Sequence, residues 1–276
     1  MIIKKKILSN EIIRRKLKQI RSKDKHLFKN DHVRFIGNSY IYNLKNTTIS
    51  SDGRLITTSN GIINDYLGFS SISKKVALKK IVLKSVYYLN IFIKKIFFKS
   101  IFVNMNCVVI YNRNSNGFFH WLTDTLPKIT IARKINKKFT LVLPSKLNLK
   151  FINQSLNEYN IKFFFMKENK NYHFKKITYI GELYPSGSPR KKVLENLKKQ
   201  IKTKPSKFNR VYISRNKSNR RKISNEIELI KVLMKYKFKI VYAEKLSFLS
   251  QVNLFSSAKF LIGLHGAGIS NILWMK

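Results

Sequence analysis

Three groups of residues in this chain of 276 combine side chains that can carry out chemistry. The first is His265-Gly266-Ala267-Gly268, which follows an apolar run and precedes a segment that can start a helix. Glycines let the backbone approach a ligand closely, and a helix start offers unpaired N–H groups and the positive end of the helix dipole. This order predicts a phosphate-binding loop, in which His265 can donate a hydrogen bond to a phosphate or to a leaving oxygen. A tight turn with a packed histidine is the alternative.

The second group surrounds Arg215, which directly follows the expected strand 211–214. Arg221 lies on the polar loop that Arg215 begins. Asn225 can cap the helix after this loop, because Glu228 follows three residues later in a capping-box arrangement. Guanidinium groups donate hydrogen bonds in a planar fork, which suits a pyrophosphate. Arg215 and His265 each follow the carboxyl end of a strand, the edge at which open α/β sheets bind ligands. In a chain so rich in cations, a solvated basic loop is the alternative.

The third group is the segment 118–127, Phe-Phe-His-Trp-Leu-Thr-Asp-Thr-Leu-Pro. His120 and Asp124 are four residues apart and therefore share one face of a helix, while apolar residues occupy another. An imidazole and a carboxylate placed in this way can act as a base, or as a base and the group that orients it, at a sugar hydroxyl. The alternative is an intrahelical pair that only stabilises the helix locally. No third ligand is recognisable, so we predict no metal site.

Taken in this order and spacing, the three groups resemble glycosyltransferase family 61. The resemblance covers residues 107–276, and residues 1–106 match no family that we recognise. The matching segments are 119–127, 213–215, 221–226, 244–248 with Gln251, and 265–268 with Asn271.

The resemblance implies two Rossmann-like domains of the GT-B type, a nucleotide-sugar donor and inversion at the anomeric carbon. It places Asp124 or His120 on the acceptor side as the base. It places the following residues at the donor diphosphate and nucleotide: Arg215, Arg221, Asn225, Glu244, Ser247, Gln251, His265, Gly266 and Gly268. A helix start with arginines can stabilise the leaving pyrophosphate without a divalent ion, so no cofactor is required, although a divalent metal stays open. Family members continue for several elements past the glycine motif, so we expect an incomplete donor domain.

The pattern of apolar runs from residue 107 onward predicts an α/β fold. Strands are expected at 107–111, 140–143, 161–166, 177–180, 211–214, 238–243 and 259–264. Helices are expected at 118–134 with a kink at Pro127, at 149–159, at 190–204, at 225–236 and at 247–257 with a cap at Ser247. The predicted division is a first, acceptor-side domain over 107–204 and a donor domain over 205–276, joined by the cluster 185–189.

Residues 1–106 form a basic region that we expect to belong to the first domain. Residues 1–35 predict a partly helical lead-in, because Ile12, Ile13, Leu17 and Ile20 fall on a rough helical stripe. Residues 33–69 predict short strands with a hairpin turn at Asp52-Gly53. The hydrophobic stretch 81–111 is interrupted by lysines and is unsuited to crossing a membrane. We expect it to pack in a core rather than to lie on a membrane surface.

The composition sets the remaining expectations. There are 56 Lys and Arg against 13 Asp and Glu, a net charge of +43, and 44% hydrophobic residues, so the chain is expected to fold. The positive charge has two kinds of explanation. It can reflect a coding sequence biased towards lysine, or it can serve to bind nucleic acid, anionic lipid or an acidic glycan. Cys107 is the only cysteine, and no apolar segment of a secretory signal follows the basic N-terminus, so we expect a cytoplasmic protein. Attraction of the positive charge to anionic lipid would place it peripherally at the inner face of the membrane.

The expected partners are a nucleotide-sugar donor and a glycan or lipid-linked glycan acceptor of surface polysaccharide or lipopolysaccharide synthesis. The alternative is a basic nucleic-acid- or anionic-membrane-binding protein of α/β fold without catalysis. An RNA-binding aromatic signature, a zinc finger and a heptad basic region are all missing from the sequence, which disfavours nucleic acid.

Overall fold

The computed structural model describes residues 2–14, 21, 24, 33–53, 56–58, 61–62, 89, 93, 96–217 and 221–275. Its strands are β1 (Ile2–Leu8), β2 (Glu11–Arg14), β3 (Val33–Ile36), β4 (Ser39–Ser50), β5 (Ile56–Thr58), β6 (Gly61–Ile62), β7 (Lys99–Val103), β8 (Cys107–Val109), β9 (Thr140–Leu143), β10 (Lys162–Phe165), β11 (Lys170–Ile180), β12 (Arg210–Ile213), β13 (Lys239–Val241) and β14 (Phe260–Gly263). Its α-helices are α2 (Phe118–His120), α3 (Lys128–Ile135), α4 (Lys150–Glu158), α5 (Lys191–Lys198), α6 (Glu226–Lys235) and α7 (Phe248–Ser257). Shorter turns of helix are Trp121–Thr125, Ser145–Leu147, Ala243–Lys245 and Ala267–Trp274. The chain is mixed α/β, as the sequence predicts.

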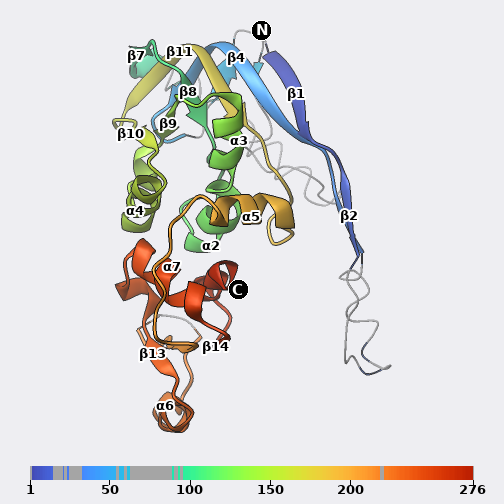
Figure 1. Ribbon diagram of the computed structural model, residues 1–276. Helices are drawn as coiled ribbons and strands as arrows, with labels where there is room; N and C mark the ends of the chain where they lie inside the picture. The colour runs from blue at the N-terminus through green and yellow to red at the C-terminus, as the bar shows by residue number, and fades with distance from the viewer. Residues whose placement is uncertain are drawn as a thin grey trace.

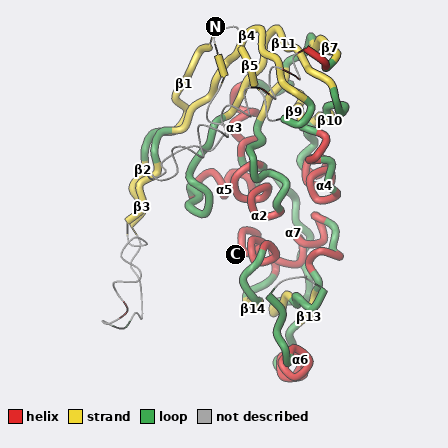
Figure 2. The backbone as a smooth tube through the Cα atoms, turned by 180° about the vertical axis from the view of Figure 1, so that it is seen from behind, coloured by secondary structure: helices red, strands yellow, loops and turns green. Residues whose placement is uncertain are grey.

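The larger sheet has the strand order β10-β9-β8-β11-β4-β5-β6, with β1 also paired to β4 and β7 to β11. The strands β10, β9, β8 and β11 run parallel, whereas β4, β5, β6 and β1 join in antiparallel pairs. Every residue of β8 is buried, as expected for a parallel strand that is covered on both faces. Helices α3 and α4 lie between this sheet and the smaller one (Figures 1 and 2). Strands from residues 1–106 thus belong to the same sheet as β8–β11.

The N-terminal segment is extended, so the predicted helical lead-in is wrong where the structure describes it. Ile12 and Ile13 lie in β2 and pair with Phe35 and Arg34 of β3, while Leu17 and Ile20 fall outside the described residues. The β-branched pairs in this segment favour strands, and pairing with β3 and β4 outweighs a weak helical stripe. The β2–β3 ribbon reaches away from the main sheet (Figure 2).

The strands predicted after residue 33 are confirmed in β3 to β6, together with the turn at Asp52-Gly53. Gly53 has φ +67°, a left-handed conformation, and its N–H donates to the Ser50 carbonyl at 2.8 Å. A β-carbon there would also stand 2.7 Å from Cγ of Pro144. Glycine is therefore required at this position.

The helix predicted over 118–134 is broken into α2, a π-helical turn over Trp121–Thr125 and α3. Leu126 N–H donates to the Trp121 carbonyl at 2.7 Å, five residues back. Pro127 has no N–H to give to the carbonyl of Thr123, and the hydroxyl of Tyr184 donates to that carbonyl instead. The break predicted at Pro127 therefore occurs, spread over the preceding turn.

The smaller sheet is parallel, with the order β13-β12-β14. The cap at Ser247 is confirmed, because its Oγ accepts from Ser250 N–H at 3.1 Å. The capping box at Asn225 is wrong: its side chain makes no cap hydrogen bond, and Nδ2 donates to Glu228 Oε2 at 3.3 Å. Helix α5 ends at Lys198, earlier than predicted.

The hydrophobic stretch 81–111 divides in two. Residues of β8 are buried, and Ile101 and Val103 pack against the core, as predicted. The side chains Leu89, Ile93, Ile96, Phe97 and Phe102 are exposed, so core packing is wrong for them. Residues 81–88, 90–92 and 94–95 lie outside the described part of the chain. In the described residues, no helix combines the length and apolarity needed to cross a membrane.

Candidate functional site

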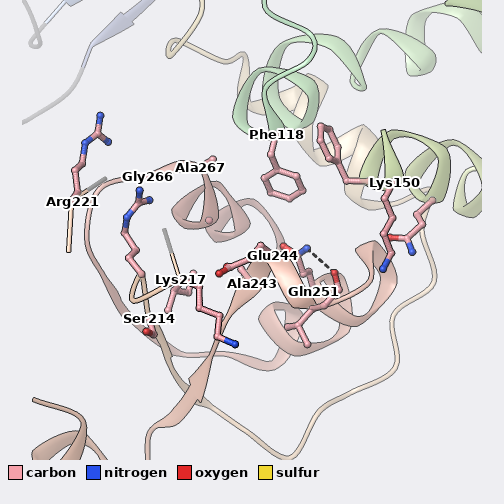
Figure 3. Close-up of a pocket in the computed structure, with 16 residues that line it drawn as sticks. Phe118, Lys150, Ser214, Lys217, Arg221, Ala243, Glu244, Gln251, Gly266 and Ala267 are labelled. Atoms are coloured by element: carbon pink, nitrogen blue, oxygen red, sulfur yellow. Dashed lines mark hydrogen bonds between the residues drawn. The ribbon is translucent and has the colours of Figure 1, made fainter. Parts of the chain in front are cut away.

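A cleft of about 530 Å³ lies between the two sheets' helices and loops (Figure 3). One wall comes from α2 and α4, and the other from the segments that follow β12, β13 and β14, at the carboxyl ends of three parallel strands. Its lining residues are Phe118, Lys150, Phe151, Gln154, Ile213, Ser214, Arg215, Lys217, Arg221, Ala243, Glu244, Leu246, Gln251, Gly266, Ala267 and Gly268.

The cleft gathers most of the residues that the sequence places at the donor. Those that line it are Arg215, Arg221, Glu244, Gln251, Gly266 and Gly268. Three others lie outside its lining: Asn225 begins α6, Ser247 caps α7, and His265 is an exposed residue whose carbonyl accepts from Arg221 Nη1 at 3.1 Å. Three lining residues carry no recognisable signal in the sequence, because the fold alone brings α4 opposite the glycine loop: Lys150, Phe151 and Gln154. Lys217, on the basic loop after β12, also lines the cleft and is not predicted by the sequence.

Arg215 is fixed at its backbone by a buried carboxylate. Its N–H donates to Glu226 Oε1 at 3.3 Å, and the hydroxyl of Tyr212 donates to the same oxygen at 2.6 Å. Glu226 is only 5% exposed. Burial and the neighbouring Glu226 both raise the pKa of Tyr212, so its hydroxyl stays protonated and keeps donating.

The guanidinium of Arg215 lies directly against Gly266. A β-carbon built on Gly266 would stand 1.7 Å from Arg215 Nη1 and 2.8 Å from Cζ. Gly266 itself has φ 169°, an extended backbone that any residue can adopt. The need for glycine here is therefore steric and comes from the arginine.

Behind the glycine loop, two buried amides join it to α7. Asn271 Nδ2 donates to Gln251 Oε1 at 2.8 Å and to the Gly268 carbonyl at 3.0 Å. Asn271 is fully buried and Gln251 is 5% exposed. Gln251 thus borders the cleft while its side chain holds the loop in place.

His120 and Asp124 meet as predicted, and a serine joins them. His120 Nδ1 lies 2.8 Å from Asp124 Oδ2, and Ser186 Oγ donates to the same oxygen at 2.6 Å. The other carboxylate oxygen, Oδ1, accepts from Thr123 Oγ1 at 2.8 Å. Asp124 is 7% exposed, whereas the His120 side chain is 33% exposed. The carboxylate is therefore enclosed by donors, and the imidazole reaches the surface.

The hydrogen bond from Ser186 to Asp124 is not predicted by the sequence. Ser186 lies in the cluster 185–189, which reads as a connection, and 62 residues separate it from Asp124. Arg34 of β3 holds this cluster by donating from Nη1 to Ser188 Oγ at 2.7 Å and to the Gly187 carbonyl at 3.1 Å. The N-terminal ribbon thus positions the loop that carries Ser186.

The two halves of the site adjoin. Helix α2, which ends at His120, packs against the helical turn Ala267–Trp274 that follows the glycine loop. Phe118 of α2 lines the cleft and forms an edge-to-face pair with Phe151 at 5.4 Å between ring centroids. Helix α2 therefore brings Phe118 into the cleft and ends at His120 close to the turn that follows Gly266, while His120 and Asp124 themselves lie outside the lining of the cleft.

Cations also cluster at the rim of the cleft. The ammonium groups of Lys217 and Lys245 lie 5.1 Å and 5.9 Å from the ring centroid of Tyr242. Contact with Lys245, followed by partial desolvation, lowers the pKa of Lys217, and Glu244 partly opposes this. Two cations held this close favour an anionic ligand between them. Within the described residues, no three His, Cys, Asp or Glu side chains are grouped closely enough to hold a metal ion.

Comparison with known proteins identifies the family. Residues 118–276 match the sequence model described as Glycosyltransferase 61, which covers more than half of the chain. No curated protein shows a significant match to the sequence. The matched region begins at α2 and includes the whole lining of the cleft. The chain therefore belongs to the glycosyltransferase 61 family.

Proposed function

We propose that this protein is an inverting glycosyltransferase that moves a sugar from a nucleotide-sugar donor to a hydroxyl of a glycan acceptor. The observation that carries the proposal is the packing of the Arg215 guanidinium on Gly266 at one wall of the cleft. The histidine–carboxylate pair begins at the end of α2, the helix that supplies Phe118 to the opposite wall and packs on the turn after the glycine loop. The family membership supports the transferase class. On this proposal the two sheets represent the two halves of a GT-B enzyme, with the donor half built on β12–β14.

The donor diphosphate is placed against Arg215, with Arg221 and Lys217 facing the same cleft. In a single-step inversion the bond from the anomeric carbon to the phosphate oxygen breaks, and its electron pair stays on the nucleoside diphosphate. Fixed cations stabilise that developing charge without a reorganisation step. Phe118 and Phe151 offer an apolar surface on the opposite wall of the cleft, where the sugar or the base can stack.

The acceptor base is His120, and Asp124 orients it. With Nδ1–H directed to the carboxylate, Nε2 carries the lone pair that takes the proton of the acceptor hydroxyl as the new bond to the anomeric carbon forms. Asp124 suits this role because it is buried and both of its oxygens already accept hydrogen bonds. Between the two bases that the family resemblance allows, the geometry favours His120.

The acceptor is placed among the glycans or lipid-linked glycans of surface polysaccharide or lipopolysaccharide synthesis, at the cytoplasmic face of the membrane. The net charge of +43 favours an anionic membrane or an acidic acceptor. This mechanism requires no cofactor, because fixed cations of the chain stabilise the charge on the leaving diphosphate.

The proposal is tested by incubating the full chain with a panel of nucleotide sugars and measuring release of the nucleoside diphosphate. Slow hydrolysis of at least one donor is expected, and Arg215→Ala should lower it at least tenfold, since one charge-assisted contact is worth about 1.5–3 kcal/mol. Arg210→Ala is the matched control, because Arg210 donates to the Tyr236 carbonyl away from the cleft. Equal loss in both variants would contradict the assignment of Arg215.

A further inference from the structure

The loop of residues 183–190 carries Ser186, whose hydroxyl donates to Asp124 Oδ2, and we name it the serine loop. Its tip, residues 185–187, is exposed. Four of the residues that flank the tip are buried: Leu183, Tyr184, Ser188 and Arg190. Inside the loop, Ser188 N–H donates to the Pro185 carbonyl at 3.0 Å and closes the tip into a turn. The buried residues on either side of the tip therefore decide where the exposed serine lies.

The side chain of Arg190 joins the serine loop to the β2–β3 ribbon. Its Nε donates to the Leu183 carbonyl at 3.0 Å, which ties the two ends of the loop together. Nη1 donates to Glu11 Oε2 of β2 at 3.0 Å, and Nη2 donates to the carbonyl of Gly37, directly after β3, at 2.7 Å. Each of the three guanidinium nitrogens thus has a partner, which a charged group that is only 6% exposed requires.

Arg34 of β3 contacts the tip of the serine loop itself. Its Nη1 donates to Ser188 Oγ and to the Gly187 carbonyl. Gly187 has φ +79°, a left-handed conformation that favours glycine. Glycine therefore lets the tip turn sharply at this position, and Arg34 fixes the turn from outside the loop.

The fixed tip places one hydroxyl beside both members of the histidine–carboxylate pair. Ser186 Oγ lies 2.6 Å from Asp124 Oδ2 and 3.2 Å from His120 Nδ1. Because Thr123 donates to the other oxygen, Oδ1, the carboxylate cannot rotate without losing a hydrogen bond. The direction of the carboxylate in turn sets the direction and the tautomer of the His120 ring.

From these contacts we infer that Arg190 and Arg34 are positioning residues for the proposed base and act through Ser186. The inference rests on the proposed function and deepens it, because it adds residues outside the cleft to those that control transfer. Glu11 and Arg34 lie outside the region 118–276 that matches the family model. A misplacement of about 1 Å can cost a reaction roughly a hundredfold, so contacts away from the reacting atoms can control the rate.

The first test compares Arg34→Ala with Arg210→Ala in the full chain. Both arginines are partly buried and donate to a main-chain carbonyl, but Arg210 lies on β12 of the smaller sheet. Arg34→Ala should lower kcat for transfer by roughly threefold to tenfold and leave the donor KM within about twofold, and Arg210→Ala should change neither. Arg190→Lys, which keeps the buried charge but loses the planar fork, should lower kcat by a similar factor. An unchanged kcat in Arg34→Ala, or an equal loss of donor affinity, would overturn the inference.

A double-mutant cycle asks whether Arg34 acts through Ser186. Transfer by Arg34→Ala/Ser186→Ala should be no slower than by the slower of the two single variants, because the effects of residues that act through one another do not add. If the two single losses multiply in the double variant, Arg34 does not act through the serine and the inference is wrong. Melting temperatures show that each variant is folded, and Arg34→Ala keeps the test available if Arg190→Lys does not fold.

The ring signal of His120 in a histidine-selective NMR spectrum gives a measurement that does not need transfer. The signal is assigned by its loss in His120→Ala. Arg34→Ala and Ser186→Ala should both shift it, and Arg210→Ala should leave it in place. An unmoved signal in Arg34→Ala, with transfer by the unmodified chain, would overturn the inference alone. A shifted signal in a chain that transfers no sugar would overturn the proposed function and support the positioning of the pair by the serine loop.

Discussion

The guanidinium of Arg215 occupies the space that a side chain at position 266 would need, with Nη1 only 1.7 Å from the β-carbon that an alanine there would carry. Arg215 follows β12 and Gly266 follows β14, the neighbouring parallel strand, so the contact joins the two motifs across one sheet edge. The absence of a side chain at Gly266 thus leaves the space that the Arg215 guanidinium occupies.

Replacing Gly266 with alanine should displace the Arg215 guanidinium and weaken nucleotide binding about tenfold or more, since a charge-assisted hydrogen bond contributes roughly 1.5–3 kcal/mol. The fold should survive, because φ 169° suits any residue and the clash involves the end of a flexible side chain. Titration calorimetry measures the affinity. Gly37→Ala is the control, since no atom lies within 4 Å of its β-carbon. Unchanged affinity in Gly266→Ala would show that the guanidinium position is unimportant.

Glu226 should be needed for stability as well as for the position of Arg215. Its removal in Glu226→Ala leaves the buried Tyr212 hydroxyl without its acceptor and should lower the free energy of unfolding by about 2–3 kcal/mol. The control on the same helix is Glu228→Ala, an exposed residue, for which a change within about 0.5 kcal/mol is expected. Urea denaturation measures both. Similar values for the two variants would contradict the role given to Glu226.

The catalytic pair should separate binding from transfer. Asp124→Asn should retain donor binding and lose transfer by about 10²–10⁴-fold, and His120→Ala should lose at least as much, because general base catalysis contributes in that range. Ser186→Ala should lower the rate less, roughly threefold to tenfold, since Thr123 still holds the carboxylate. The measurement is transfer rate alongside nucleotide affinity. Retained transfer in Asp124→Asn would contradict the orienting role of Asp124 and would show that His120 can act as the base without it.

As pH rises, nucleotide affinity should fall at a lower pH than it would if Lys217 had the ordinary pKa of a lysine. The pKa of Lys217 is lowered, mainly by Lys245, so Lys217 loses its proton below the usual lysine range. The protonated form attracts a diphosphate, hence affinity is present at lower pH and is lost as pH rises through the lowered pKa. Lys217→Arg should move that loss to higher pH, because arginine stays charged. Identical pH profiles of affinity for the unmodified protein and for Lys217→Arg would exclude this lysine.

The thiol of Cys107 should be silent in the folded protein. Cys107 is 3% exposed, and burial raises its pKa to about 12, so neither access nor ionisation favours attack. At pH 8 a thiol-reactive dye should label it only as fast as the protein unfolds, and at once in denaturant. Rapid labelling of the native protein would show that β8 is not part of a closed core.

Much of this arrangement could be predicted because its signals are local. The strands that precede Arg215 and His265 are short apolar runs, and the pairing of His120 with Asp124 follows from helical spacing. The contact of Ser186 with Asp124 could not be predicted, since it joins residues 62 apart through a loop that has no pattern of its own. The extended N-terminus was mispredicted for a related reason. Its partner strands lie farther along the chain, and pairing outweighed local propensity.

The exposure of Phe97 and Phe102 shows another limit of sequence reasoning. Apolar residues near a buried strand read as core, but strand pairing decides which faces are covered. Phe102 pairs in register with His173 on β11, their rings meet edge to face at 5.2 Å between centroids, and Phe102 is 78% exposed. A sequence pattern cannot show which of the two sides of a strand other elements cover.

The central claim is most directly tested by nucleotide-dependent thermal stabilisation of the unmodified chain and of Arg215→Ala. At least one nucleoside diphosphate sugar, at about a hundred times its dissociation constant, should raise the melting temperature of the unmodified protein by roughly 5 °C or more, and should leave Arg215→Ala nearly unshifted. A panel in which no nucleotide stabilises the unmodified chain, while oligonucleotides bind with a steep salt dependence, would contradict the account.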